Sequence, residues 1–258
     1  MAEPADLAPR PWIALGPQDA PAIVFVHGTR MTRTQWYPQL RRLAARYRCV
    51  AVDLPGHGRR AGEPFTMEAA VAALDEAIAA EVPAGRAVLV GLSLGGYVAI
   101  ETAVAHPERV AGLVLAGCSA EAVGAAARLF GLLAMLLERT PRPTIDRLNR
   151  WFFTIRFRRS IAGPIIEGGF WPEGGAAAVR RLIGRRFLER LSRLWTPVLV
   201  VNGSLDPVFA PQGEYWAASC RAGRHVLLPH ATHLSCLDRP TTFARHVAAF
   251  TDEVAQGA

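Results

Sequence analysis

The sequence predicts an α/β protein built on a mostly parallel, doubly wound sheet, with a helical insertion late in the chain. Short runs rich in Val, Leu and Ile show no polar alternation, which is typical of parallel strands covered on both faces. Helical patterns separate these runs, and this order favours a doubly wound sheet. The expected strands are Ala22–Val26, Arg48–Val52, Ala87–Leu92, Gly112–Ala116, Val198–Asn202 and His225–Leu228.

Four helices are expected between and after these strands. Apolar residues recur at helical spacing in 34–47. Thr66 stands where a side-chain oxygen can cap the helix 66–81. The helix 94–106 ends before Pro107, and Pro240 suits the first turn of the final helix, 240–254.

Residues 119–195 are the expected insertion, which divides the core into a first part, 1–118, and a second part, 196–258. Helical patterns cover 122–138, 145–158 and 176–194, whereas 161–175 is rich in Gly and Pro and is expected to be a loop. Ligands of open α/β sheets bind beyond the carboxyl ends of the strands, so we expect this helical cap to cover a binding site there. The alternative is a packed helical subdomain that contacts no ligand. The cap residues expected to contact a hydrophobic substrate are Trp151, Phe152, Phe153 and Trp171.

The basic residues are all arginine: there are 29 of them, and the formal net charge is +7. The absence of lysine excludes Schiff-base and catalytic-lysine chemistry. Residues 119–195 hold 14 arginines and six acidic residues. Such a patch can bind nucleic acid, but no nucleic-acid-binding motif accompanies it, so no nucleic-acid partner is expected. Solvated helix faces explain the charge; recognition of a carboxylate or phosphate is the alternative.

Several other classes of protein and site are not expected. The chain has no run of about 18 apolar residues that predicts a membrane span, and its acidic N-terminus lacks a signal-peptide pattern. The four cysteines show neither C-x-x-C pairing nor metal-ligand spacing, which predicts reduced thiols in a cytoplasmic protein. No metal and no cofactor is expected, because no metal cluster, nucleotide-binding loop or cofactor motif is found. The sequence leaves the oligomeric state open.

The strongest functional pattern is Gly91-Leu92-Ser93-Leu94-Gly95, between an expected strand and an expected helix. This order is typical of a strand–nucleophile–helix turn, in which a serine hydroxyl is exposed at the tip of a strained bend. Glycine two residues before and after Ser93 suits a bend where a Cβ atom would clash. The N-terminus of the following helix would face an oxyanion formed at Ser93.

A serine nucleophile needs a base and an acid that orients the base, and both are expected later in the chain. Asp206 follows the strand 198–202, and His233 lies in the loop between the last strand and the last helix. His230 is the other histidine of that loop. Two further carboxylates are expected to be structural: Asp53 organises a turn, and Asp238 caps the final helix.

In order and spacing these motifs resemble the α/β-hydrolase fold family, in particular its small, capped, serine esterase-like members. The resemblance covers nearly the full chain and extends to His27-Gly28-Thr29 and to the turn 53–58. It implies that Ser93 is the nucleophile, that His233 is the general base and then acid, and that Asp206 orients His233. It also implies an oxyanion hole made by the backbone N–H groups of Thr29 and Leu94.

The resemblance implies hydrolysis of an ester or thioester of a small, largely hydrophobic substrate through an acyl-serine intermediate. Other reactions on the same fold stay open: C–C bond hydrolysis, perhydrolysis, lactone hydrolysis, acyl transfer and biosynthetic cyclisation. An alternative of another class is a hydrolase-fold protein that binds a ligand with negligible turnover. A small-molecule substrate is the only partner expected.

Overall fold

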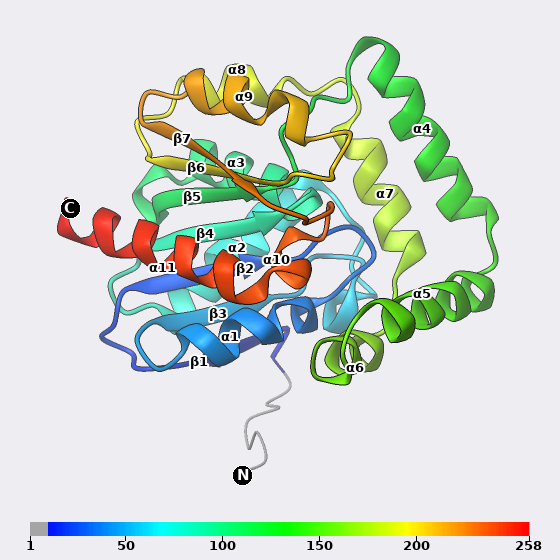
Figure 1. Ribbon diagram of the computed structural model, residues 1–258, viewed down its shortest axis with the longest axis horizontal. Coiled ribbons are helices and arrows are strands. Elements are labelled where there is room, and N and C mark those ends of the chain that lie inside the picture. The colour runs from blue at the N-terminus through cyan, green and yellow to red at the C-terminus, as the bar shows by residue number, and fades with distance from the viewer. Residues whose placement is uncertain (1–9, 258) are drawn as a thin grey trace.

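The computed structural model describes residues 10–257 and has a seven-stranded sheet at its centre (Figure 1). The strand order is β1-β3-β2-β4-β5-β6-β7, and every pair except β1–β3 is parallel. The predicted mostly parallel α/β sheet is therefore confirmed. Its strands are β1 (Trp12–Leu15), β2 (Ala22–Val26), β3 (Arg48–Val52), β4 (Ala87–Leu92), β5 (Val110–Ala116), β6 (Val198–Gly203) and β7 (Gly223–Leu228).

Strand β1 is the strand that the sequence analysis missed. It is four residues long, pairs antiparallel with β3 at the edge of the sheet, and buries only Trp12 and Ile13. All four residues are apolar, but a run of four is at the lower limit of strand length and is not distinguished as a strand by pattern alone.

Helices cover both faces of the sheet, and alternate strand residues point into the two resulting cores. In β2, Val24 and Val26 belong to one core and Ile23 and Phe25 to the other.

The helix α2 (Met67–Glu81) is capped by Thr66 as predicted, because Oγ1 of Thr66 accepts a hydrogen bond from the backbone N–H of Ala69 at 3.0 Å. The first face carries α2, α3 (Leu94–Ala105), α8 (Phe187–Ser192) and α9 (Gly213–Ala218); the second carries α1 (Tyr37–Leu43) and α11 (Pro240–Gln256), with the short α10 (Ser235–Asp238) before it. Short 3₁₀ helices occupy Arg33–Trp36, Gly58–Arg60, Pro107–Arg109 and Ala210–Gln212.

The insertion between β5 and β6 is helical throughout, and its first four helices gather at one end of the sheet (Figure 1). The prediction of a loop over 161–175 is wrong, because most of this segment is helical. Pro164 lies inside α6, and the burial of Ala162 and Ile165 in the core stabilises the helix around it. The single helix expected over 176–194 is two helices, separated near Gly184, whose φ of +81° ends the first. The helices are α4 (Gly124–Arg139), α5 (Arg142–Arg156), α6 (Arg159–Gly168), α7 (Pro172–Leu182) and α8.

Close packing around the turn at residue 93 requires glycine. A Cβ atom at Gly95 would lie 2.1 Å from the carbonyl oxygen of Val26, and one at Gly91 would lie 2.3 Å from the carbonyl carbon of Gly95. In both cases the obstacle is backbone, so no side-chain rotation relieves the clash. The strand β2, the strand β4 and the helix α3 are thus in contact without intervening side chains.

We expect Gly95→Ala to lower the free energy of unfolding by about 3 kcal/mol, because the backbone of β2 or α3 must shift to admit the methyl group. Urea denaturation measures the change. Gly131→Ala in α4 is the matched control, since a Cβ atom there meets nothing within 4 Å, and it should stabilise the protein by about 0.5–1 kcal/mol. Equal effects of the two substitutions would contradict the close approach.

Candidate active site

Ser93 lies at a strained bend between β4 and α3. Its backbone has φ +54° and ψ −116°, a region that non-glycine residues rarely adopt. Its backbone N–H donates to the carbonyl oxygen of Ala116 in β5 at 2.8 Å. The strained backbone is held by its neighbours and leaves the hydroxyl group at the end of the strand, beside a cavity.

His233 and Asp206 form a hydrogen-bonded pair next to Ser93, in which the carboxylate is buried and the imidazole is partly exposed. Nδ1 of His233 lies 3.0 Å from Oδ2 of Asp206, while Oδ1 of Asp206 accepts from the backbone N–H groups of Val208 and Phe209 at 3.0 and 3.1 Å. Burial acts to raise the pKa of Asp206, but the hydrogen bonds from His233 and from these two N–H groups outweigh it and hold that pKa below its ordinary value. The carboxylate therefore stays ionised beside the imidazole.

Two neighbouring residues pack against the ring of His233. The Phe209 ring stacks against it with centroids 5.0 Å apart. On another side, a Cβ atom at Gly117 would lie 2.9 Å from Nδ1 of His233, and Gly117 also has a φ of +54°. Gly117, which the sequence analysis missed, is therefore the residue that leaves room for the imidazole directly after β5.

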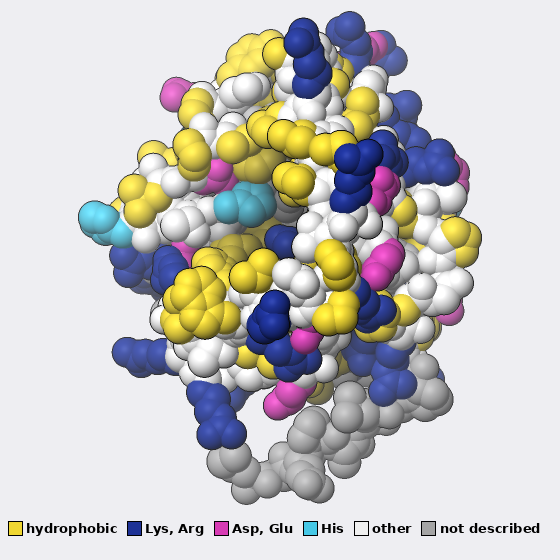
Figure 2. All heavy atoms as spheres, turned by 90° about the vertical axis from the view of Figure 1, so that its right-hand side faces the viewer, with side chains coloured by type: hydrophobic (Ala, Val, Ile, Leu, Met, Phe, Trp, Pro, Cys, Tyr) yellow, Lys and Arg dark blue, Asp and Glu magenta, His cyan; other side chains and the backbone are white. Residues whose placement is uncertain are grey.

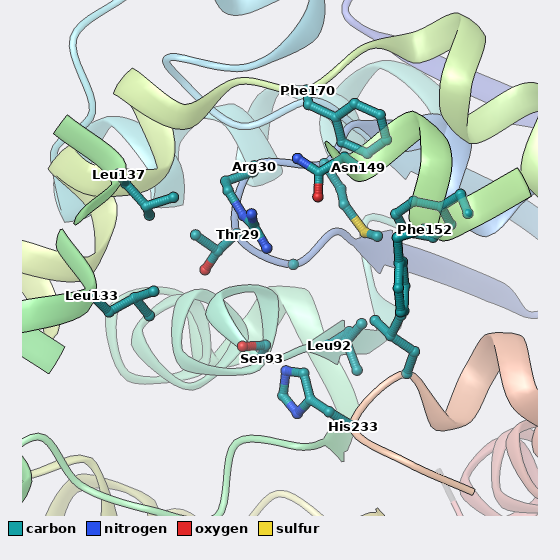
Figure 3. Close-up of a pocket in the computed structure, with 14 residues that line it drawn as sticks. Thr29, Arg30, Leu92, Ser93, Leu133, Leu137, Asn149, Phe152, Phe170 and His233 are labelled. Atoms are coloured by element: carbon teal, nitrogen blue, oxygen red, sulfur yellow. The ribbon is translucent and has the colours of Figure 1, made fainter. Parts of the chain in front are cut away.

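Ser93 and His233 both line one cavity of about 450 Å³ and lie beside each other in it (Figure 3). No hydrogen bond joins these two described side chains. The backbone N–H groups of Thr29 and Leu94 have no hydrogen-bond acceptor within residues 10–257. Leu94 is the first residue of α3, so its N–H belongs to a helix N-terminus. The structure thus brings together the five residues of the predicted triad and oxyanion hole, with two N–H groups unoccupied.

His27 holds the loop that carries Thr29. Its Nδ1–H donates to the carbonyl oxygen of Gly28 at 2.9 Å, and its Nε2 accepts from the backbone N–H of Leu54 at 3.0 Å. Burial lowers the pKa of His27 to about 4 despite the hydrogen bond to Gly28. His57 packs against it, and burial lowers its pKa to about 3. Both imidazoles are neutral at pH 7 and serve as structural hydrogen-bonding groups.

Asp53 organises its turn as expected. Its two carboxylate oxygens accept from the backbone N–H groups of Arg33 and Arg59 at 2.8 and 2.9 Å, and the Arg33 guanidinium pairs with it. The side chain is completely buried.

The expected role of Asp238 is wrong, because the N-terminus of α11 has no side-chain cap. One carboxylate oxygen of Asp238 instead accepts from the backbone N–H and the hydroxyl group of Thr232, both at 2.7 Å. The other accepts from Arg156 at the end of α5 at 2.6 Å. Asp238 therefore ties the cap to the residue that precedes His233.

The cavity lies between the sheet and the cap. From the cap side, the surface is hollowed between apolar side chains, with a histidine and a basic side chain inside the hollow (Figure 2). Of the four cap residues expected to contact substrate, Phe152 and Phe153 line the cavity; Trp151 and Trp171 lie outside its lining. Trp151 is 62% exposed, and Trp171 packs under the Arg142 guanidinium. Lining residues that the sequence analysis missed are Arg30, Met31, Leu133, Leu137, Asn149, Phe170 and Leu234.

No group of three or more His, Cys, Asp or Glu side chains within residues 10–257 could hold a metal ion. None of the helices in this part of the chain is long and apolar enough to cross a membrane.

Comparisons with known proteins agree with this architecture. The model of the alpha/beta hydrolase family matches residues 23–246. The chain is 31% identical to the pimeloyl-(acyl-carrier protein) methyl ester esterase of Nitrosomonas europaea, over 87% of this chain and 93% of the relative. It is 30% identical to the enzyme of the same name from Aeromonas hydrophila, over 89% and 95% of the two chains. Among solved structures, a thermophilic esterase from Thermogutta terrifontis with malate bound has a TM-score of 0.78 at 27% identity, covering 94% of this chain and 93% of that one. These matches span nearly the whole sequence, and the chain belongs to the alpha/beta hydrolase family of enzymes.

Proposed function

We propose that this enzyme hydrolyses carboxylic esters with Ser93 as nucleophile, His233 as general base and acid, and Asp206 as the orienting carboxylate. The observation that carries the proposal is the 3.0 Å contact between His233 and Asp206 in the same cavity as a serine at a strained bend. The order of the three residues along the chain, Ser–Asp–His, is that of this fold.

Each group then has a defined step. His233 removes the proton of the Ser93 hydroxyl group as the oxygen attacks the ester carbonyl carbon, and Asp206 stabilises the imidazolium that forms. The N–H groups of Thr29 and Leu94 donate to the resulting oxyanion. His233 then protonates the departing alkoxide, which leaves an acyl-serine. Water, activated by the same imidazole, attacks the acyl-serine and releases the acid.

The lining of the cavity favours an acyl group with an apolar chain. Five apolar side chains of the cap line it; they are Leu133, Leu137, Phe152, Phe153 and Phe170. Curated relatives named as methyl ester esterases support a small alkoxy leaving group. We infer that the enzyme cleaves small alkyl esters whose acyl chain lies beneath the cap.

A second candidate is an ester whose acyl group is attached to an acyl carrier, as the names of the relatives state for those proteins. The charge of the cap favours it, because residues 119–195 hold 14 arginines against six acids. An excess of positive charge around a cavity raises the association rate of an anionic partner. This candidate predicts that added salt lowers kcat/KM steeply for the carrier-linked ester but not for a small neutral ester.

Labelling with a fluorophosphonate tests the proposal directly. We expect one covalent adduct on the intact protein, located at Ser93 by peptide mass spectrometry, together with turnover of p-nitrophenyl butyrate. A folded protein that binds ligand while Ser93 stays unlabelled is a binding protein, and the proposed function is then wrong. Turnover with an adduct at another serine would overturn the assignment of the nucleophile.

A further inference from the structure

Among the described residues that line the cavity beside Ser93, Arg30 alone carries a permanent charge, on its guanidinium. Arg30 follows Thr29 in the loop after β2, and its side chain projects into the cavity (Figure 3). No Asp or Glu is among the described residues that line the cavity. Within residues 10–257 the Arg30 side chain makes no hydrogen bond and no ion pair. Burial lowers its pKa, and no acidic group raises it again. The charge is therefore partly desolvated and uncompensated.

Arg30 has a strained backbone, and contacts with the cap fix its position in the cavity. Its backbone has a φ of +68°, a region that disfavours any residue with a Cβ atom. The backbone N–H of Trp171 donates to the carbonyl oxygen of Arg30 at 2.9 Å, which ties the loop to the cap. A Cβ atom at Gly175 in α7 would lie 2.7 Å from Cγ of Arg30, so the cap needs a glycine where the arginine stem passes.

A second polar group without a partner lines the same cavity. Nδ2 of Asn149 in α5 is buried and has no hydrogen-bond partner in the described part of the chain. A buried donor without an acceptor lowers the stability of the folded protein, and nearly all buried polar groups in folded proteins have a hydrogen-bond partner. The amide of Asn149 thus lies in a cavity whose other cap residues are apolar.

We propose that Arg30 and Asn149 form a subsite for a free carboxylate on the acid portion of the substrate, so that the preferred substrates are monoesters of dicarboxylic acids. The guanidinium offers a planar pair of N–H donors that matches a carboxylate, and the amide supplies one more. This inference rests on the proposed function, because Ser93 marks the end of the cavity where the ester is cleaved.

The charge balance favours a carboxylate over a phosphate. A carboxylate carries one negative charge, which Arg30 neutralises, whereas a phosphate dianion would leave a further charge in a largely apolar cavity. The apolar side chains that line the same cavity suit the methylene chain of a dicarboxylic acid. An ester attached to an acyl carrier has no free carboxylate at that end and would therefore gain nothing from this subsite.

Binding to the Ser93→Ala protein tests the subsite without requiring turnover. Calorimetry should show monomethyl adipate binding about 10- to 100-fold more tightly than methyl hexanoate, the range expected for hydrogen bonds to a charged group. Arg30→Gln in the same background should abolish that preference. Asn149→Asp should do so as well, since the new carboxylate occupies the guanidinium. Arg41→Gln is the matched control, because Arg41 is an exposed arginine of α1 that does not line the cavity, and it should keep the full preference.

Turnover by the otherwise wild-type enzyme provides the second readout. We expect kcat/KM to favour monomethyl adipate over methyl hexanoate, and Arg30→Gln to lower this ratio by about 10- to 100-fold. Equal binding of the two esters to Ser93→Ala overturns the subsite even if both are hydrolysed. A preference for the ω-phosphonate ester, or an equal loss of kcat/KM on both esters in Arg30→Gln, overturns it too. Absence of turnover with the binding preference intact contradicts the proposed hydrolysis and leaves the anion subsite supported.

Discussion

Ser93→Ala is expected to lower kcat for p-nitrophenyl butyrate on the order of 10⁶-fold, because no other hydroxyl group lies at the strained bend. The oxyanion-hole donors and the binding cavity stay in place, so residual catalysis above the rate in water should remain. Alanine keeps a Cβ atom at the positive φ, and the backbone strain is therefore the same in both proteins. Initial rates at saturating ester give the change in kcat.

Ser192→Ala is the matched control for this substitution. Ser192 is exposed at the end of α8, where its hydroxyl group donates to the carbonyl oxygen of Glu189 at 2.9 Å. It should leave kcat within about twofold, since surface substitutions of this kind change little. Circular dichroism of both variants checks the fold. A Ser93→Ala enzyme with more than one hundredth of the wild-type kcat would show that the nucleophile lies elsewhere.

The positions of the three triad residues could be predicted because each follows the end of a strand that the sequence identifies. Uninterrupted apolar runs identify buried parallel strands, and the carboxyl ends of such strands meet at one edge of the sheet. Ser93, Asp206 and His233 follow β4, β6 and β7, and the structure brings them to one cavity. The edge strand β1 shows the limit of this reasoning, because an apolar run of only four residues is too short to be distinguished as a strand.

The cap residues that line the cavity were harder to predict, because tertiary packing decides which face of each cap helix points inward. Three consecutive aromatic residues in α5 cannot share one face of a helix. Phe152 and Phe153 line the cavity, while Trp151 is 62% exposed. Arg30 was missed for a related reason: an arginine in a loop is usually solvated, and only the packing of the cap shows that its charge lies in the cavity that Ser93 also lines.

Asp206→Asn is expected to lower kcat by about 10⁴-fold, the usual cost of losing a carboxylate that fixes the tautomer of a catalytic histidine. The backbone N–H groups of Val208 and Phe209 donate to Oδ1 of Asp206 and still need an acceptor. The amide oxygen of the asparagine will take that position and turn its NH₂ group towards Nδ1 of His233. Nδ1 must then accept, the ring proton moves to Nε2, and that nitrogen can no longer remove the Ser93 proton.

Asp238→Asn removes the same charge from the neighbourhood of His233 and serves as the matched control. Asp238 contacts Thr232 and Arg156, and no hydrogen bond joins it to His233 in the described structure. Its loss should weaken the link between the cap and the histidine loop and lower kcat by less than about tenfold, since a charged hydrogen bond contributes about 1.5–3 kcal/mol to folding and not to the chemical step. Kinetics with p-nitrophenyl butyrate compare the two variants. If Asp238→Asn proves the more damaging, the loop anchored by Asp238, and not the tautomer set by Asp206, positions the base.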